Sequence, residues 1–280
     1  LDTTKELMAN LLGSLKPTDR FNVLFFAGDS AVLSQQSLTA TPKNIALAIS
    51  MMNNQNGGGG TELYPALQQV FAMESDENAS RNIVLITDGY ISAEDRIFRL
   101  IDKQLHRNNM FVFGIGESVN RFLIEGIAKV GRAEAFVVTS RAEAAKKSKQ
   151  FQYYITAPAL TNISVQAEGV ELYDMEPAKV PDMLAQRPIM VIGKYRNVTK
   201  NARITLDGVN GQGAQSWSFP LADAKASDST LPQLWARKRL ERLYVISDEN
   251  EDEQRKHIVK LGLQYSLLTS HTSFIAVDET

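Results

Sequence analysis

Two segments of the sequence combine residue types that could bind a metal ion. Asp88 and Gly89 follow directly on residues 82–87 (NIVLIT), which read as a buried strand, and Thr61 follows the four glycines at 57–60. A carboxylate and a hydroxyl are hard oxygen ligands of the kind that Mg²⁺, Mn²⁺ and Ca²⁺ prefer. In an open α/β sheet, ligands bind beyond the edge where the strands end, and both segments are expected there. Together they indicate a divalent-cation site.

Each segment also has a simpler interpretation. Asp-Gly is a common turn dipeptide, so Asp88 and Gly89 could serve only to end a strand. The glycines before Thr61 could form a flexible loop, with the threonine as the N-cap of the next helix. In the metal-site interpretation, Gly59, Gly60 and Gly89 let the backbone come close to whatever binds. Both interpretations stay open on the residues alone.

Other kinds of site find no support in the sequence. The segment at 57–61 lacks the lysine that a phosphate-binding loop places before its Ser or Thr. The three histidines form no metalloprotease pattern, and no Gly-x-Ser-x-Gly nucleophile motif occurs. Cys is absent, which excludes disulfides, thiolate zinc sites and cysteine nucleophiles. We therefore expect no enzymatic activity.

The composition limits which classes of protein and which kinds of partner are possible. At roughly 150 residues per domain, 280 residues suggest about two domains, and 44% hydrophobic with 22% charged residues is typical of a globular protein. Lys and Arg number 30 against 32 Asp and Glu, so the net charge is −2 and a broad nucleic-acid surface is not expected. No apolar run approaches the roughly 20 residues of a membrane-spanning helix.

The first half of the chain alternates short apolar runs with amphipathic segments. Strand-like runs lie at 21–27, 82–87, 110–115 and 135–139. Helical spacing of apolar residues predicts helices near 7–15, 45–52, 61–73, 98–105, 123–130 and 141–154. Short strands separated by helices are typical of a parallel sheet that is covered on both faces. We predict a doubly wound α/β domain with a mostly parallel sheet over residues 1–157.

The pattern changes at Ala157 and Pro158, and residues 158–280 are predicted to form a second, β-rich domain. Alternating or β-branched runs predict a small, sandwich-like antiparallel unit, with strands at 163–166, 189–192, 202–206 and 216–219. Residues 231–246 read as an amphipathic helix whose basic side chains face outward: Arg237, Lys238, Arg239 and Arg242. The acidic run at 248–253 reads as a solvated loop or a helix start. A final helix and a short strand pair, around Tyr265 and Phe274, follow it.

The sequence resembles a known family over nearly its whole length. The stretches that carry the resemblance are LDTTKELMANLLGSLKPTDRFNVLFFAG, GGGGTELYPALQ, NIVLITDGYIS, FGIGESVNRFLIEGIAKVG, LWARKRLERL and YSLLTSHTSFIAVDE. Their combination resembles a von Willebrand factor A domain protein of the inter-alpha-trypsin inhibitor heavy chain type. The absence of Cys and the segments GGGGTEL and FGIGESVNR make the sequence more similar to the bacterial branch of this type than to the animal plasma proteins.

The resemblance implies a metal-ion-dependent adhesion site built from three loops. Thr61 matches the residue that the second loop supplies, and Asp88 matches that of the third. The first loop carries an Asp-x-Ser-x-Ser motif that occurs nowhere in this sequence, and Leu1 corresponds to the start of the helix that follows it. The chain is therefore expected to lack the first strand of the domain, and to bind Mg²⁺, Mn²⁺ or Ca²⁺ weakly or not at all by itself.

By the same resemblance, the first strand lies between the strands expected at 21–27 and 82–87. Its absence would expose unpaired backbone groups on an apolar edge, which is a template for foreign strands. We therefore expect a strand-completing partner chain, a cleaved upstream piece or a swapped oligomer to fill the gap.

The function that the resemblance implies is that of a non-enzymatic adhesion or protein-binding module. The bound cation would leave one position open for an acidic side chain of a protein ligand, with Glu62, Tyr64 and Tyr90 on the rim around it. A simpler interpretation makes these three an exposed helix turn and loop. The β-rich half would support the A domain, and the resemblance implies an extracytoplasmic location. The alternative function is a surface or envelope scaffold with a degenerate, unused metal site.

Overall fold

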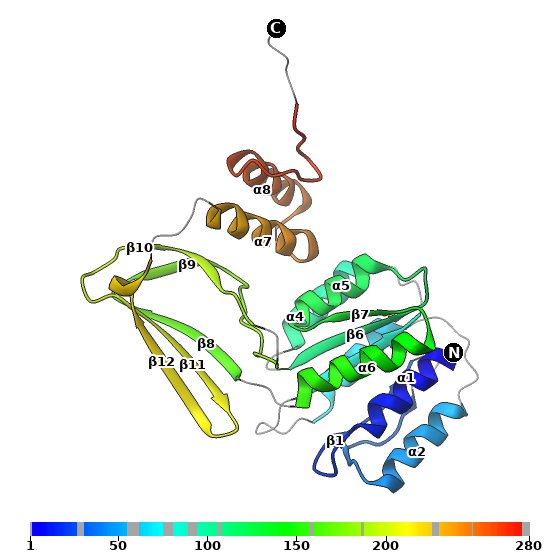
Figure 1. Cartoon of the computed structure of the whole chain (residues 1–280). Helices are drawn as coiled ribbons and strands as arrows, with labels where there is room; N and C mark the ends of the chain where they lie inside the picture. Colours follow the sequence, from blue (N-terminus) through cyan, green and yellow to red (C-terminus); the bar gives the residue numbers. More distant parts are fainter. Residues whose placement is uncertain are drawn as a thin grey trace. The chain divides into compact units, whose positions relative to one another are not determined.

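The computed structural model divides the chain into two compact units (Figure 1). Unit 1 comprises Leu1–Ala159 and Asp182–Pro188, and unit 2 comprises Leu160–Pro181 and Ile189–Thr280. The structure describes residues 2–26, 31–54, 62–74, 81–88, 94–105, 108–156, 160–185, 188–225, 230–247 and 249–275. Within these residues, no helix is long and apolar enough to cross a membrane.

A parallel sheet forms the centre of unit 1. Its strand order is β5 (Asn82–Thr87), β6 (Asn109–Ile115) and β7 (Ala135–Val138), with both pairs parallel. All seven residues of β6 are buried, because this strand has a neighbour on each side and helices on both faces. Such continuous burial explains why NMFVFGI carries almost no polar side chain.

Helices cover both faces of this sheet (Figure 1). On one face, α1 (Asp2–Gly13) packs beside α6 (Arg141–Thr156), and on the other face lie α4 (Glu94–Gln104) and α5 (Arg121–Val130). Two further helices, α2 (Pro42–Asn53) and α3 (Leu63–Ala72), complete the unit. The prediction of an α/β fold with a parallel sheet is confirmed.

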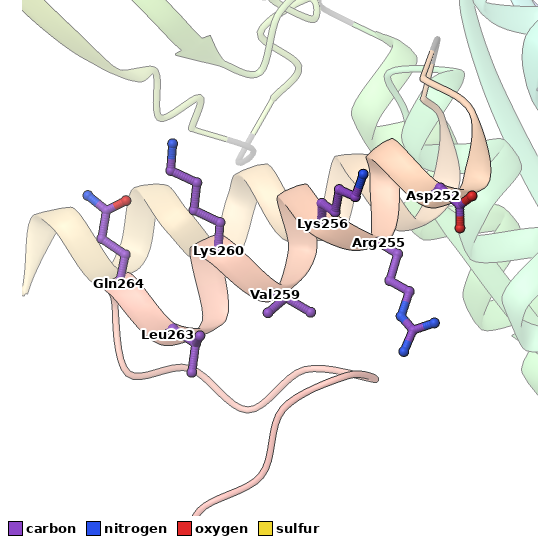
Figure 2. Close-up of a pocket in the computed structure, with 7 residues that line it drawn as sticks. All are labelled: Asp252, Arg255, Lys256, Val259, Lys260, Leu263 and Gln264. Carbon is purple, nitrogen blue, oxygen red and sulfur yellow. The ribbon is translucent and has the colours of Figure 1, made fainter.

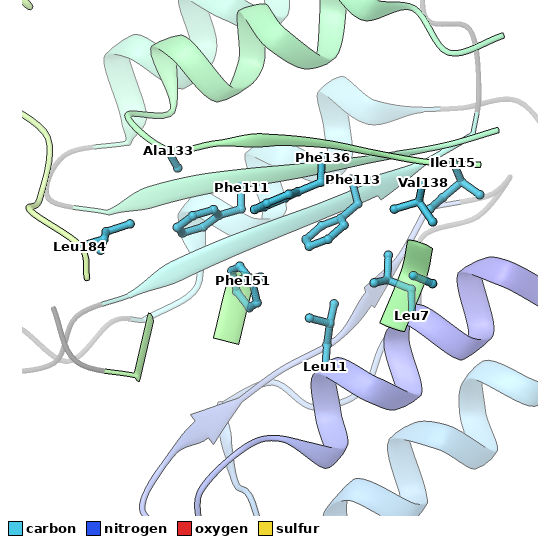
Figure 3. Close-up of a cluster of buried hydrophobic side chains, with 11 residues drawn as sticks. Leu7, Leu11, Phe111, Phe113, Ile115, Ala133, Phe136, Val138, Phe151 and Leu184 are labelled. Atoms are coloured by element: carbon cyan, nitrogen blue, oxygen red, sulfur yellow. The ribbon is translucent and has the colours of Figure 1, made fainter. Parts of the chain in front are cut away.

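Aromatic side chains dominate the core between β6 and the α1–α6 face. Figure 3 shows Phe111 and Phe113 of β6 directed toward Phe151 of α6 and Leu11 of α1. Phe113 stacks on Phe136 with ring centroids 4.6 Å apart, and Phe111 meets Phe151 edge to face at 4.9 Å. Large rings in these geometries bury much apolar area and fix the helices on the sheet.

The prediction of one continuous strand at 21–27 in the parallel sheet is wrong. The structure has two short antiparallel pairs instead: β1 (Arg20–Phe21) with β4 (Leu38–Thr39), and β2 (Leu24–Phe25) with β3 (Ala31–Val32). Between β1 and β2, the Asn22 side chain accepts hydrogen bonds from Val23 N and Ser34 N and donates one to Ser34 O. These side-chain bonds replace ladder bonds and interrupt the strand. Ala27 lies outside the described residues.

A short segment from the second half of the sequence belongs to unit 1. Leu184 is buried in the same core as Phe111, and Asn109 Nδ2 donates a 2.8 Å hydrogen bond to Asp182 Oδ2. Burial lowers the pKa of Arg132, while the negative charge of Asp182 acts to raise it. Asp182 and Leu184 thus join unit 1 through a polar contact and an apolar contact, respectively.

Unit 2 contains two antiparallel sheets. One has the order β12 (Gly213–Pro220), β11 (Arg203–Asn210) and β8 (Thr161–Glu168), and the other pairs β9 (Glu171–Glu176) with β10 (Ile192–Arg196). The strand predicted at 189–192 therefore starts only at Ile192, and β9 was not predicted. A 3₁₀ turn, η1 (Leu221–Asp223), follows β12.

Two helices follow the sheets of unit 2. They are α7 (Leu231–Val245) and α8 (Glu251–Gln264), which share a core around Trp235, Leu240 and Ile258. The acidic run starts α8: Asn250 accepts from Glu253 N as the N-cap, and acidic residues occupy the first turn, where the helix dipole favours them. Among the described residues near the C-terminus, the predicted strand pair is reduced to one bridge between Thr269 and Thr272.

The prediction that all four basic residues of α7 face outward is wrong for two of them. Arg239 and Arg242 are only 18% and 29% exposed. Arg239 Nη1 and Arg242 Nε donate hydrogen bonds of 2.9 and 3.0 Å to Glu176 Oε1, on a carboxylate that is 3% exposed. The buried carboxylate of β9 therefore draws both guanidinium groups inward.

Candidate functional site

The candidate site lies where the parallel strands of unit 1 end. Because β5, β6 and β7 run in the same direction, their carboxyl ends meet at one edge, and α4 and α5 begin beside it. Thr87, the last residue of β5, is buried, whereas Asp88 directly after it is exposed. The strand thus presents the Asp88 carboxylate at the rim of the sheet.

Three of the predicted site residues lie within the described part of the chain. Asp88 is the first. Glu62 is exposed at the N-cap position of α3, where its side chain makes no capping hydrogen bond, and Tyr64 is half-buried in the first turn. The remaining predicted residues, Thr61, Gly59, Gly60, Gly89 and Tyr90, lie outside the described residues.

A cation–π contact joins the first turns of α3 and α4. The Arg96 guanidinium carbon lies 3.9 Å from the centroid of the Tyr64 ring, and Arg96 itself is exposed. A guanidinium at this distance is attracted by the ring face, and the contact holds the two helix starts together. It also places a positive charge beside a rim whose other charged groups include Glu62 and Asp88.

A side-chain hydrogen bond joins the first turns of α4 and α5. Asn120 is the N-cap of α5, since its Oδ1 accepts from Leu123 N at 3.0 Å, and its Nδ2 donates to Glu94 Oε1 at 3.0 Å. One asparagine therefore caps its own helix and fixes the start of the neighbouring helix. Three helix starts are linked around the rim, in the order α3, α4 and α5.

Sequence reasoning missed Glu94, Arg96 and Asn120. Asn120 carried a usable signal, because an asparagine directly before an amphipathic run is a common N-cap. Glu94 and Arg96 carried none, since their partners are 26 and 32 positions away in the sequence. The links between helix starts depend on the packing of the helices on the sheet.

The described residues supply only part of a cation site. The exposed Asp88 carboxylate suits a hard cation, which prefers about six oxygen ligands. However, within the described ranges no three His, Asp or Glu side chains come together in a way that could hold a metal ion. Thr61, the other predicted ligand, lies outside these ranges. The structure therefore places one of the two predicted ligands at the rim.

Comparisons with known proteins relate the chain to one family. Residues 1–135 match a family model described as the von Willebrand factor type A domain. A von Willebrand factor A domain-containing protein of Dictyostelium discoideum is 24% identical over 287 residues, covering 100% of this chain and 31% of that protein. The mouse von Willebrand factor A domain-containing protein 5A is 23% identical over 288 residues, covering 100% and 36%. The chain spans about a third of the length of these relatives.

Solved structures show the same fold at low sequence identity. The von Willebrand factor type A protein from Catenulispora acidiphila superposes with a TM-score of 0.63 at 14% identity, covering 95% of this chain and 75% of that one. The ArnB paralog VWA2 from Sulfolobus acidocaldarius gives a TM-score of 0.54 at 14% identity, with the same coverage. The similarity to both structures extends beyond the parallel sheet into unit 2.

Proposed function

We propose that unit 1, in which residues 1–135 match the von Willebrand factor type A domain, is a non-enzymatic module that binds another protein at the rim around Asp88. The observation that supports this most is the exposed Asp88 carboxylate at the end of the buried strand β5. The helix starts around it are linked by the Tyr64–Arg96 and Glu94–Asn120 contacts, so the rim is preorganised. The names of the relatives carry no enzymatic activity, which is consistent with a binding role.

We further propose that Asp88 and Thr61 contribute oxygen ligands to a divalent cation, Mg²⁺, Mn²⁺ or Ca²⁺. Domains of this family commonly bind such ions. A bound cation would supply a positive centre with a position open to an acidic side chain of a protein ligand. Two side chains are few for an ion that prefers about six oxygens, so the affinity of this chain alone is expected to be weak.

The surface that contacts the ligand would include Glu62, Tyr64 and Tyr90. Tyr64 offers a half-buried ring whose position is fixed by Arg96. Rigid aromatic side chains next to an arginine are favoured at protein interfaces, because they bury large area at a small entropic cost. The Arg96 charge would also favour an acidic ligand.

Calorimetric titration with Mn²⁺ tests the proposal on the chain itself. We expect saturable one-site binding with a dissociation constant on the order of 10⁻³ M, at the weak end for oxygen-ligated cations. Asp88→Ala should abolish it. Asp95→Ala is the matched control, because Asp95 is an exposed carboxylate in the first turn of α4 and should be dispensable. Absence of binding to the parent chain would contradict a cation site formed by this chain alone, and equal loss in both variants would contradict the part assigned to Asp88.

A second candidate function is a surface or envelope scaffold in which the metal site is unused. The observation that favours it is the lack, within the described ranges, of a clustered set of acidic or histidine ligands. The scaffold would retain its protein contacts in Asp88→Ala and in the presence of chelator, whereas the adhesion module would lose them.

The assignment of the chain to one type and branch within the family is also a proposal. The matching stretches in both halves of the sequence support the inter-alpha-trypsin inhibitor heavy chain type and its bacterial branch, and with them an extracytoplasmic location. Localising the tagged full-length protein by cell fractionation checks the last point, and recovery with the cytoplasmic fraction would contradict it.

A further inference from the structure

The outward side of α8 forms an open groove in unit 2 that has no part in the proposed metal site. The opposite side of the helix packs into the core that α8 shares with α7, through Ile258 and Leu261. Among the described residues, the groove is lined by α8 alone, with the side chains of Asp252, Arg255, Lys256, Val259, Lys260, Leu263 and Gln264. We call this surface the α8 groove.

Two rows of side chains form the walls of the α8 groove (Figure 2). Within each row the residues are four positions apart, with Lys256, Lys260 and Gln264 on one side and Arg255, Val259 and Leu263 on the other. Rows with this spacing are the ridges by which helices pack, because a second helix lays a ridge of its own into the groove between them. The α8 groove therefore has the form that another helix would fill.

One row of the α8 groove is apolar over its C-terminal part. Val259 is half-buried, and Leu263, one turn later, is 71% exposed. Single exposed leucines are normal on protein surfaces, but here two branched apolar side chains are neighbours on one ridge. Apolar side chains one turn apart are the anchors by which an amphipathic helix is recognised in a groove.

The α8 groove is basic beyond its first turn. Arg255, Lys256 and Lys260 are exposed, and none of them makes an ion pair or a side-chain hydrogen bond in the part of the chain that the structure describes. The acidic residues of α8 are confined to its first turn, and of these only Asp252 lines the groove, at its N-terminal end. Between residues 254 and 275 the sequence has no Asp or Glu. The charge of the groove therefore favours an acidic partner.

Two other occupants fit the α8 groove less well. A second copy that used the same surface would bring three unpaired positive charges against three. A membrane surface attracts clusters of about four to eight basic residues and takes up an extended apolar face, whereas the groove offers three basic and two apolar side chains. The exposed apolar side chains that follow α8 do not line the groove: Leu268, Phe274 and Ile275.

We propose that the α8 groove binds an amphipathic helix of another protein that carries an acidic row beside an apolar row. On α8, the row with Val259 and Leu263 runs one position before the row with Lys256 and Lys260. An antiparallel helix with its rows in the same order would place its apolar row against the first and its acidic row against the second. The two lysines are four residues apart, about 6 Å along the axis, and glutamates four residues apart have the same spacing. The matching segment is therefore Leu-Glu-x-x-Leu-Glu.

Fluorescence anisotropy of a dye-labelled peptide tests the proposal on the full chain. The probe is an end-blocked, alanine-rich helical peptide with one Leu-Glu-x-x-Leu-Glu segment (the Glu peptide), and its anisotropy should rise to saturation as the chain is added. A version with Lys in place of both Glu (the Lys peptide) should bind about tenfold more weakly, because it meets the basic row with like charges. A version with Ala in place of both Leu should also bind more weakly, because it lacks the apolar anchors.

Substitutions in the α8 groove assign the site. Lys260→Glu should weaken binding of the Glu peptide about tenfold and strengthen binding of the Lys peptide. Arg237→Glu is the matched control, because it makes the same change of charge at an exposed position of α7 that does not line the groove. Leu263→Ser should weaken the Glu peptide, whereas Leu268→Ser, at a leucine that is 67% exposed and outside the groove, should not. All four positions are exposed, so the fold should be kept.

The helix-binding site would be overturned by the absence of a saturable rise in anisotropy, by equal binding of the Glu and Lys peptides, or by equal effects of the groove and control variants. Sedimentation of the chain with phosphatidylserine vesicles that Lys260→Glu abolishes, without peptide binding, would assign the groove to a membrane instead. A dimer in light scattering that Leu263→Ser abolishes would assign it to a second copy. Asp88→Ala should bind the Glu peptide as the parent does, so none of these outcomes bears on the metal titration.

Discussion

The Glu176 carboxylate shows how a single buried charge organises its surroundings. It accepts hydrogen bonds from Arg239 and Arg242 while only 3% exposed. Glu176→Gln would keep the size of the side chain but leave the partly buried Arg242 without its counter-charge, and Arg239 with only Asp174, at 3.9 Å. Removing one partner of a buried ion pair costs about 3–5 kcal/mol, and we expect the lower part of that range because both arginines keep some solvent contact. Urea unfolding followed by tryptophan fluorescence measures the change.

An exposed ion pair in the same unit is the control. The pKa of Glu171 lies below its ordinary value because Arg196 donates hydrogen bonds to it. Its contribution to stability is therefore present above about pH 4.5 and is lost as the pH falls through the lower pKa of the folded state. Glu171→Gln should change the unfolding midpoint little, since exposed pairs contribute little. Equal midpoints for the two variants would mean that burial of Glu176 does not matter.

Single residues were predictable where their role follows from local sequence. Asp88 could be placed at a strand end because the six residues before it form an apolar run. The inward orientation of Arg239 and Arg242 could not be predicted, because the carboxylate that binds them lies 63 and 66 positions away. A basic residue on a helix is exposed by default, and only a distant buried acid reverses this.

Two helices can pack closely where one of them carries a glycine, and Gly126 in α5 is such a position. A Cβ atom there would overlap the ring of Phe98 in α4. Helix propensity alone favours Ala over Gly by about 1 kcal/mol, whereas overpacking costs about 1–3 kcal/mol. We therefore expect Gly126→Ala to lower the free energy of unfolding. Gly13→Ala in α1, where the Cβ would meet open space, should be neutral or stabilising. Thermal unfolding of both variants checks this, and equal shifts would show that Phe98 moves freely.

Elements with long, regular patterns were predictable, and those held by side-chain hydrogen bonds were not. The apolar runs of β5, β6 and β7 are strands in the structure, within one residue of their predicted bounds. The region from Arg20 to Thr39 failed because its strands are two residues long and Asn22 substitutes for the backbone ladder. Periodicity has no meaning over two residues, so no sequence signal was available there.

At the scale of the whole molecule, the open side of β5 is a further contact surface that we propose. Within the described residues, β5 pairs only with β6, and Asn82 Oδ1 at its start is buried without a hydrogen-bond partner. An apolar edge with unpaired backbone groups favours a further strand, from a partner chain or from a swapped copy. If the edge is filled, light scattering of the isolated chain should give a mass above that of a monomer. If the edge is open, the chain should be a monomer in which alternate amides of β5 exchange quickly.

Amide hydrogen exchange, measured at the same protein concentration, distinguishes the outcomes. A strand that fills the edge should protect those amides of β5 that point away from β6. This protection should increase with the average mass that light scattering gives. A stable monomer with every β5 amide protected would contradict the proposal, because its edge would need no additional strand.

The segment Asp182–Pro188 gives the chain a property that bears on how such genes can be recombined. Since unit 1 closes only with these residues, the polypeptide passes from one unit to the other after Ala159, after Pro181 and after Pro188. A gene fusion that ends the coding sequence after residue 159 would deliver a first unit without Leu184 in its core and without the acceptor for Asn109. Neither unit can be transferred intact as a single uninterrupted cassette, so the two are expected to be inherited together.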